Sequence, residues 1–172
     1  YTAMNEPIFA VGNILSNKYN HTRYRVISIL DDTVVLCLMD TSKFELAFFD
    51  IEMVTDSIND ESIIIEKDED AIIFDSNVLS KSARKKFETK FKLLQEVVNI
   101  YGPSYARLYG KHDKPELKEL LNKYDIAKNS FWRLCTRYFQ SGMKPYSLLD
   151  KKSFGVNKGK TYQYTNKPGQ KS

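Results

Sequence analysis

The residues best suited to chemical recognition lie in one short segment, from Lys128 to Arg137. Arg can bond both acceptors of a guanine edge, Asn can do the same for adenine, and Ser, Thr and Lys reach phosphates or bases. In a helical projection with Phe131 facing inward, these polar side chains fall on the outer face, its flanks or the first turn. The candidate DNA-contacting residues of this segment are Lys128, Asn129, Ser130, Trp132, Arg133, Thr136 and Arg137.

The opposite face of the same helix is apolar and predicts a core: Leu134, Cys135 and Tyr138 project within about 60° of Phe131. Alternatives remain open for the outer residues. Trp132 is as well suited to fill a gap in the packing as to contact DNA. An ordinary solvated face is less expected for the two arginines, because no carboxylate stands four residues away to pair with either of them.

The elements around this helix predict a helix-turn-helix unit. We expect a first helix with Asp113 as N-cap and Glu116 as its capping-box partner, an apolar stripe of leucines, and an end near Tyr124. A four-residue turn over 124–127 leads to the second helix, over 128–140. Any three-helix bundle with short loops gives similar spacing, so an ordinary bundle is the alternative.

The segment after this helix is basic and contains several helix-breaking Gly and Pro residues. Gly142 and Pro145 are expected to end the helix, Lys144 is a further candidate DNA contact, and a Leu148–Leu149 pair can anchor the exiting chain. Residues 151–172 contain six lysines, three glycines and no acidic residue, which predicts a flexible basic linker. A plain solvated linker is the alternative. Its candidate phosphate contacts are Lys151, Lys152, Lys158 and Lys160.

Charge is distributed unevenly along the 172 residues. Residues 1–80 carry 5 basic and 15 acidic side chains, a net charge of −10, whereas residues 81–172 carry 21 basic and 7 acidic ones, a net charge of +14. Such clustered Lys and Arg favour a polyanionic partner such as double-stranded DNA. No zinc-ligand spacing, nucleophile with an adjacent base or glycine-rich phosphate loop is present, so we expect neither a cofactor nor catalysis within this chain. No apolar run is long enough for a membrane span, and an intracellular location is expected.

The first part of the chain alternates apolar and polar residues and predicts short strands. An α+β fold follows, with a small acidic β module over 1–75, a helical domain over 76–150 and the basic linker over 151–172. The module is expected to close into a small barrel. A long helix should run from about 78 to 101, where Gly102–Pro103 ends it, before a short helical segment over 104–109. The expected strands are 8–15, 23–30, 33–39, 43–49 and 51–54, with a possible hairpin of 62–66 and 71–74.

Residues 129–149 resemble the N-terminal region of TnsB-like, Mu-type DDE transposases. In that family a recognition helix runs into an Arg-Tyr-aromatic-Gln-x-Gly sequence, matched here from Arg137 to Gly142, and then into a Leu-Leu pair and a basic linker that contains glycine. The Tyr24–Ile27 stretch also resembles the family's opening β module. Two positions depart from the pattern: Ala127 stands where a Ser or Thr cap is usual, and Asp150–Lys151 stands where Pro-Asp is common.

The resemblance implies sequence-specific binding of transposon ends, together with other transposition proteins, in the bacterial cytoplasm at the nucleoid. The catalytic domain of such transposases, with its three metal-binding carboxylates and divalent metal, is expected to follow this chain. The alternative is that the acidic β module makes the chain mainly a protein-interaction module for assembling transposition proteins, with weak DNA binding.

Overall fold

The computed structural model describes residues 8–66 and 79–149, and its class is α+β. An antiparallel sheet of five strands has the order β4-β3-β2-β1-β5. Its strands are β1 (Ile14–Asn17), β2 (Arg23–Ile29), β3 (Thr33–Leu38), β4 (Leu46–Asp50) and β5 (Ile63–Glu66). The helices are α1 (Ile51–Asn59), α2 (Lys81–Tyr101), α3 (Ala106–Tyr109), α4 (Pro115–Tyr124) and α5 (Lys128–Gln140), followed by the 3₁₀ helix η3 (Pro145–Leu148).

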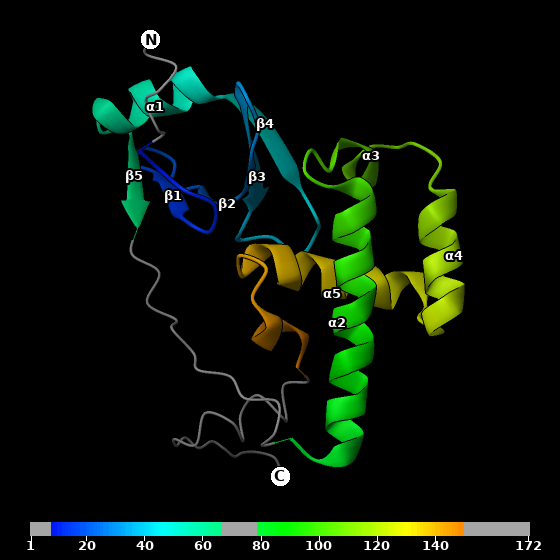
Figure 1. Ribbon diagram of the computed structural model, residues 1–172. Helices are drawn as coiled ribbons and strands as arrows, with labels where there is room; N and C mark the ends of the chain where they lie inside the picture. The colour runs from blue at the N-terminus through cyan, green and yellow to red at the C-terminus, as the bar shows by residue number, and fades with distance from the viewer. Residues whose placement is uncertain (1–7, 67–78, 150–172) are drawn as a thin grey trace.

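Apolar side chains are buried on both faces of the sheet. On one face Val34 and Leu36 of β3 pack with Val54 of α1. On the other face Val35 and Cys37 belong to a core that continues into α2, α3, α4 and α5. Figure 1 shows α1 on the outer side of the sheet and the remaining helices on the opposite side. The sheet is therefore the middle layer between α1 and the helical half.

The expected barrel is wrong, because β4 and β5 are the two edges of an open sheet and do not pair with each other. The physical reason lies in β3. A barrel strand with one solvated face would alternate apolar and polar residues, whereas all four residues from Val34 to Cys37 are buried. A continuous apolar run fits a sheet covered on both faces. Helices hide these faces, so closure into a barrel is not needed to bury them.

The expected fifth strand at 51–54 is also wrong, because these residues form the first turn of α1. Asp50 ends β4 and serves as the N-cap of α1: its side chain accepts a hydrogen bond from the Glu52 backbone N–H. Acidic Glu52 in the first turn adds a favourable interaction with the helix dipole. The strand at 63–66 is confirmed as β5, whereas the run at 71–74 lies outside the described residues.

The helical half follows the expected order, although α2, α3 and α4 each begin later than expected. α2 ends at Tyr101, α4 ends at Tyr124, and α5 covers 128–140 as predicted. Asp113, however, is not the N-cap of α4. That helix begins at Pro115, with Lys114 in the cap position and no side-chain cap. Proline suits the first helical position because its φ is already helical and its missing N–H has no partner to lose there.

The sheet and α5 are joined by buried polar contacts. Arg25 of β2 is 4% exposed; its Nε donates to the Gln140 carbonyl oxygen at 3.0 Å and its Nη1 to the Gly12 carbonyl oxygen at 2.7 Å. The Gln140 side-chain amide donates in turn to the carbonyl oxygens of Leu38 (3.0 Å) and Thr41 (2.7 Å). These bonds fix the end of α5 to the loop that connects β3 and β4. The proposed boundary near residue 76 lies among residues that the structure does not describe, and the described parts on its two sides share one core.

Candidate nucleic-acid interface

A turn of three residues, from Asp125 to Ala127, connects α4 to α5. Asp125 ends α4 in the left-handed conformation, with φ at 54°. The Ile126 backbone N–H then donates to the Leu121 carbonyl oxygen at 3.0 Å, and the Ile126 side chain packs against the helical core. Ala127 precedes α5 without a side-chain cap, so the first N–H groups of α5 lack a side-chain acceptor there. Uncapped N–H groups at a helix start favour an anion such as phosphate.

The predicted inner face of α5 is confirmed: Phe131, Leu134, Cys135 and Tyr138 are buried. Burial also raises the pKa of the Cys135 thiol. The exposed residues of the outer face are Lys128, Asn129, Ser130, Arg133 and Arg137, while Trp132 is half-buried.

The predicted exposure of Thr136 is wrong. This residue is 4% exposed, and its hydroxyl donates to the Trp132 carbonyl oxygen at 2.7 Å. The cause is the loop between β3 and β4. Its Phe44 ring lies 5.7 Å from the Trp132 ring and 5.6 Å from the Phe139 ring, one helical turn to either side of Thr136. The loop thus covers the outer face around Thr136, whereas Arg133 and Arg137 on either side of it remain exposed.

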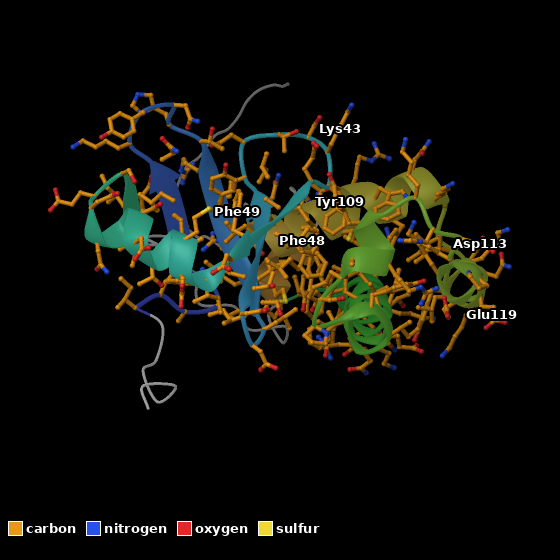
Figure 2. All side chains as sticks on the ribbon, turned by 90° about the horizontal axis from the view of Figure 1, so that it is seen from above. Lys43, Phe48, Phe49, Tyr109, Asp113 and Glu119 are labelled. Carbon is orange, nitrogen blue, oxygen red and sulfur yellow. The ribbon has the colours of Figure 1, made fainter. Side chains whose placement is uncertain are left out.

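A groove of about 570 Å³ lies where this loop meets α3 and α5. Lys43 contributes an ammonium group from the loop, and Asn129 and Arg133 contribute an amide and a guanidinium from α5. Tyr109, which is 40% exposed, adds an aromatic wall. Figure 2 shows the loop that carries Lys43 beside α5, with Tyr109 beneath it. The groove therefore combines two cations with an amide that can read a base edge.

A second hollow, of about 260 Å³, lies on the other side of Trp132, against α4. Lys114, Lys118 and Lys128 line it, with Asp113 as the one carboxylate among its lining residues. The Lys114 ammonium donates to the carbonyl oxygens of Gly110 (2.7 Å) and His112 (3.1 Å), which shapes the loop before α4. Burial, and then the nearby charge of Lys128, lower the pKa of Lys114. The repulsion between clustered cations of this kind decreases when an anion binds between them.

The carboxylate of Glu116, near the interface, is paired with other side chains. Glu116 at the start of α4 accepts from Arg107 at 2.9 Å and from the Tyr101 hydroxyl at 3.2 Å. The Arg107 hydrogen bond, first among several contacts, lowers the pKa of Glu116. Glu119 lies on the far side of α4, away from Lys43 and Tyr109 (Figure 2). The α5 side of the helical half is left with a surplus of positive charge.

Two residues of this surface were not predicted from the sequence. Lys43 and Tyr109 carry no motif, and they reach α5 only through the fold. The only sequence signal at Tyr109 is an aromatic residue directly before Gly110, at the end of the expected short helix. Among the predicted residues, Asn129 and Arg133 meet in one groove, Lys128 lines the other hollow, and Lys144 lies half-buried beyond α5. The linker candidates Lys151, Lys152, Lys158 and Lys160 lie outside the described residues.

A comparison of the chain with protein-family models and with curated proteins found no match. Within residues 8–66 and 79–149, no helix is both long and apolar enough to cross a membrane. The same residues contain no group of three or more His, Cys, Asp or Glu side chains arranged to hold a metal ion.

Proposed function

We propose that this chain binds double-stranded DNA in a sequence-specific manner, with the N-terminal half of α5 in the major groove. The observation that carries the proposal is the placement of cations on both sides of an open helix face. Lys43 and Arg133 lie in the groove on one side of Trp132, and Lys128 lies in the hollow on the other. A helix about 10–12 Å across fits the major groove, about 12 Å wide, with a phosphate backbone along each edge.

Asn129 and Arg133 are the residues proposed to read bases. They stand four residues apart on the exposed face, so their Cα atoms are separated by about 6 Å along the helix. This separation corresponds to about two base-pair steps of a duplex, at 3.4 Å each. Their amide and guanidinium suit adenine and guanine edges. Ser130 and Arg137 are exposed next to them, whereas the burial of Thr136 leaves it a packing role.

The resemblance to TnsB-like transposases narrows the proposed target to transposon-end DNA and the proposed setting to transposition, with a catalytic domain elsewhere in the full protein. The acidic sheet side of the chain supports the second candidate, an interaction module for other transposition proteins. Residues 8–66 carry 4 basic and 10 acidic side chains, and Ile64 and Ile65 of the edge strand β5 are 48% and 37% exposed. Charged and apolar surface of this kind fits a protein partner.

The test begins with selection of binding sequences from a random duplex pool, followed by fluorescence anisotropy with the selected duplex and a scrambled one. Arg133→Ala is expected to lower affinity for the selected duplex about 10- to 100-fold, which corresponds to about 1–3 kcal/mol. Affinity for the scrambled duplex should change little. The control is Arg23→Ala, because Arg23 lines neither of the two hollows beside α5 and pairs with Asp40 and Glu66.

The proposal fails if the wild-type chain binds both duplexes equally and Arg133→Ala behaves like the control. The transposon-end assignment is tested separately, since the selected sequence should recur at both ends of the mobile element that encodes the chain. A selected sequence without such repeats would leave a DNA-binding protein outside transposition.

A further inference from the structure

The first half of α2 carries a dense row of basic side chains outside the interface described above. Residues 81–92 contain six basic residues and one acidic residue, a net charge of +5. Lys81, Lys85 and Lys86 are exposed, and within residues 8–66 and 79–149 none of these three forms an ion pair. Figure 1 shows that this half of α2 extends past α4 and α5. These lysines, together with Lys90, are called the α2 lysine row below.

The α2 lysine row borders a hollow of about 680 Å³ that reaches the turn of the helix-turn-helix unit. All four lysines line it, with the hydroxyl-bearing Ser82 and Thr89 between them. Ile126 closes the hollow from the turn and is its single apolar residue. Lys128, at the start of α5, stands two residues after Ile126. The row thus reaches the turn that precedes the helix start proposed to enter DNA.

We infer that the α2 lysine row is a second DNA-contacting surface, which binds the phosphates of the same duplex beyond the stretch that α5 reads. This inference rests on the proposed function. From Lys81 to Lys90 the helix rises about 14 Å. At 3.4 Å per phosphate along one strand, a row of this length spans about four phosphates.

The side-chain chemistry selects phosphate over an acidic protein surface. Lys, Ser and Thr are regular phosphate donors, and the hollow contains six such residues against a single apolar one. The lysine stems and Ile126 give the hollow apolar walls, and the exposed Lys81, Lys85 and Lys86 give it the positive charge that suits a row of phosphates. No group in the row is placed to read bases, so the contribution to affinity is independent of sequence.

The test compares two charge-matched variants of the whole chain. Lys81→Gln with Lys85→Gln removes half of the row, while Lys18→Gln with Lys92→Gln removes two exposed lysines that do not line the hollow. Binding to the selected 30-bp duplex is measured by anisotropy across a salt series. The row variant is expected to bind about 10-fold more weakly, with a slope of log K against log salt that is shallower by about 1–2.

The ratio of affinities for selected and scrambled duplexes should stay at its wild-type value in the row variant. The control pair is expected to change affinity by less than about 3-fold and the slope by less than about 0.5, since phosphate contacts set that slope. Far-UV circular dichroism and the thermal midpoint verify that both variants fold. Trimming the duplex on one side, base pair by base pair, should abolish the difference between row variant and wild type while sequence preference persists.

Equal affinity and slope for the row variant and the control pair would overturn the inference. So would a row variant that binds DNA like the control but loses binding to a fluorescein-labelled polyglutamate peptide, because that outcome assigns the row to an acidic protein. The proposed function fails by a different readout: wild-type chain would bind selected and scrambled duplexes equally, whatever the row variant does.

Discussion

Replacing Arg25 with Met tests whether the buried guanidinium holds the sheet to α5. Methionine keeps an unbranched apolar stem but leaves the carbonyl oxygens of Gln140 and Gly12 without the bonds that Arg25 donates at 3.0 and 2.7 Å. Hydrogen bonds from a charged donor contribute roughly 1.5–3 kcal/mol each. We therefore expect the free energy of unfolding to fall by about 3 kcal/mol, near the low end for two such bonds, because water can reach the freed carbonyls after partial relaxation.

Arg23→Met is the matched control, two residues earlier on the same strand. The Arg23 side chain is 36% exposed and pairs with Asp40 at 3.3 Å and Glu66 at 3.4 Å. Exposed ion pairs of this kind contribute about 0–1 kcal/mol. In urea unfolding followed by circular dichroism, with a slope of about 2 kcal/mol per molar, the midpoint should fall by about 1.5 M for Arg25→Met and by at most about 0.5 M for Arg23→Met. Equal midpoint shifts for the two variants would refute the reasoning.

Two further predictions concern the end of α5 and the contact between α2 and α4. Gly142→Ala should destabilise the protein by about 1–2 kcal/mol in urea unfolding, because φ is +85° there and the new Cβ would lie 3.4 Å from the Arg25 Cδ; an unchanged midpoint would contradict this. The pKa of Glu96 is lowered first by the hydrogen bond from Tyr124 and then by that from Lys123. A lowered carboxyl pKa stabilises the fold above the unfolded-state pKa and loses this effect as pH falls through the folded-state pKa. Tyr124→Phe should therefore raise the pKa of Glu96 in an NMR titration and reduce the stability that this carboxylate loses on acidification. A Glu96 pKa that stays in place would exclude the bond.

The recognition-helix candidate was predictable from the sequence because its determinants are local. Apolar residues at 131, 134, 135 and 138 recur at helical spacing, and Gly142 follows the last turn. These features alone set the limits of α5 and its buried face. The start of α1 was predictable in principle: Asp50 before Glu52 is a capping signal, but the apolar residues Ile51, Met53 and Val54 also suit a strand.

The remaining errors come from contacts between residues far apart in the chain. A helical projection places Thr136 outward because it includes no contact with residues far away in the chain. Phe44, which covers this part of α5, lies about ninety residues earlier. Lys43 reaches the groove for the same reason. The open sheet depends on which elements cover its faces, and strand patterns alone do not reveal that α1 occupies one face and α5 the other.

When a strand is apolar on both faces, its hydrophobic pattern no longer fixes the register in which it pairs with its neighbour. In a one-sided sheet, a shift by one residue exposes apolar side chains and buries polar ones. In β2 and β3 the same shift would exchange one apolar set for another, at little cost in hydrophobic burial. Arg25 breaks this near-equivalence, because it pairs with Cys37 in the observed alignment and so faces the Gln140 carbonyl oxygen. Shifted by one position, its charge would enter the apolar layer under α1, so one buried arginine specifies how the strands align.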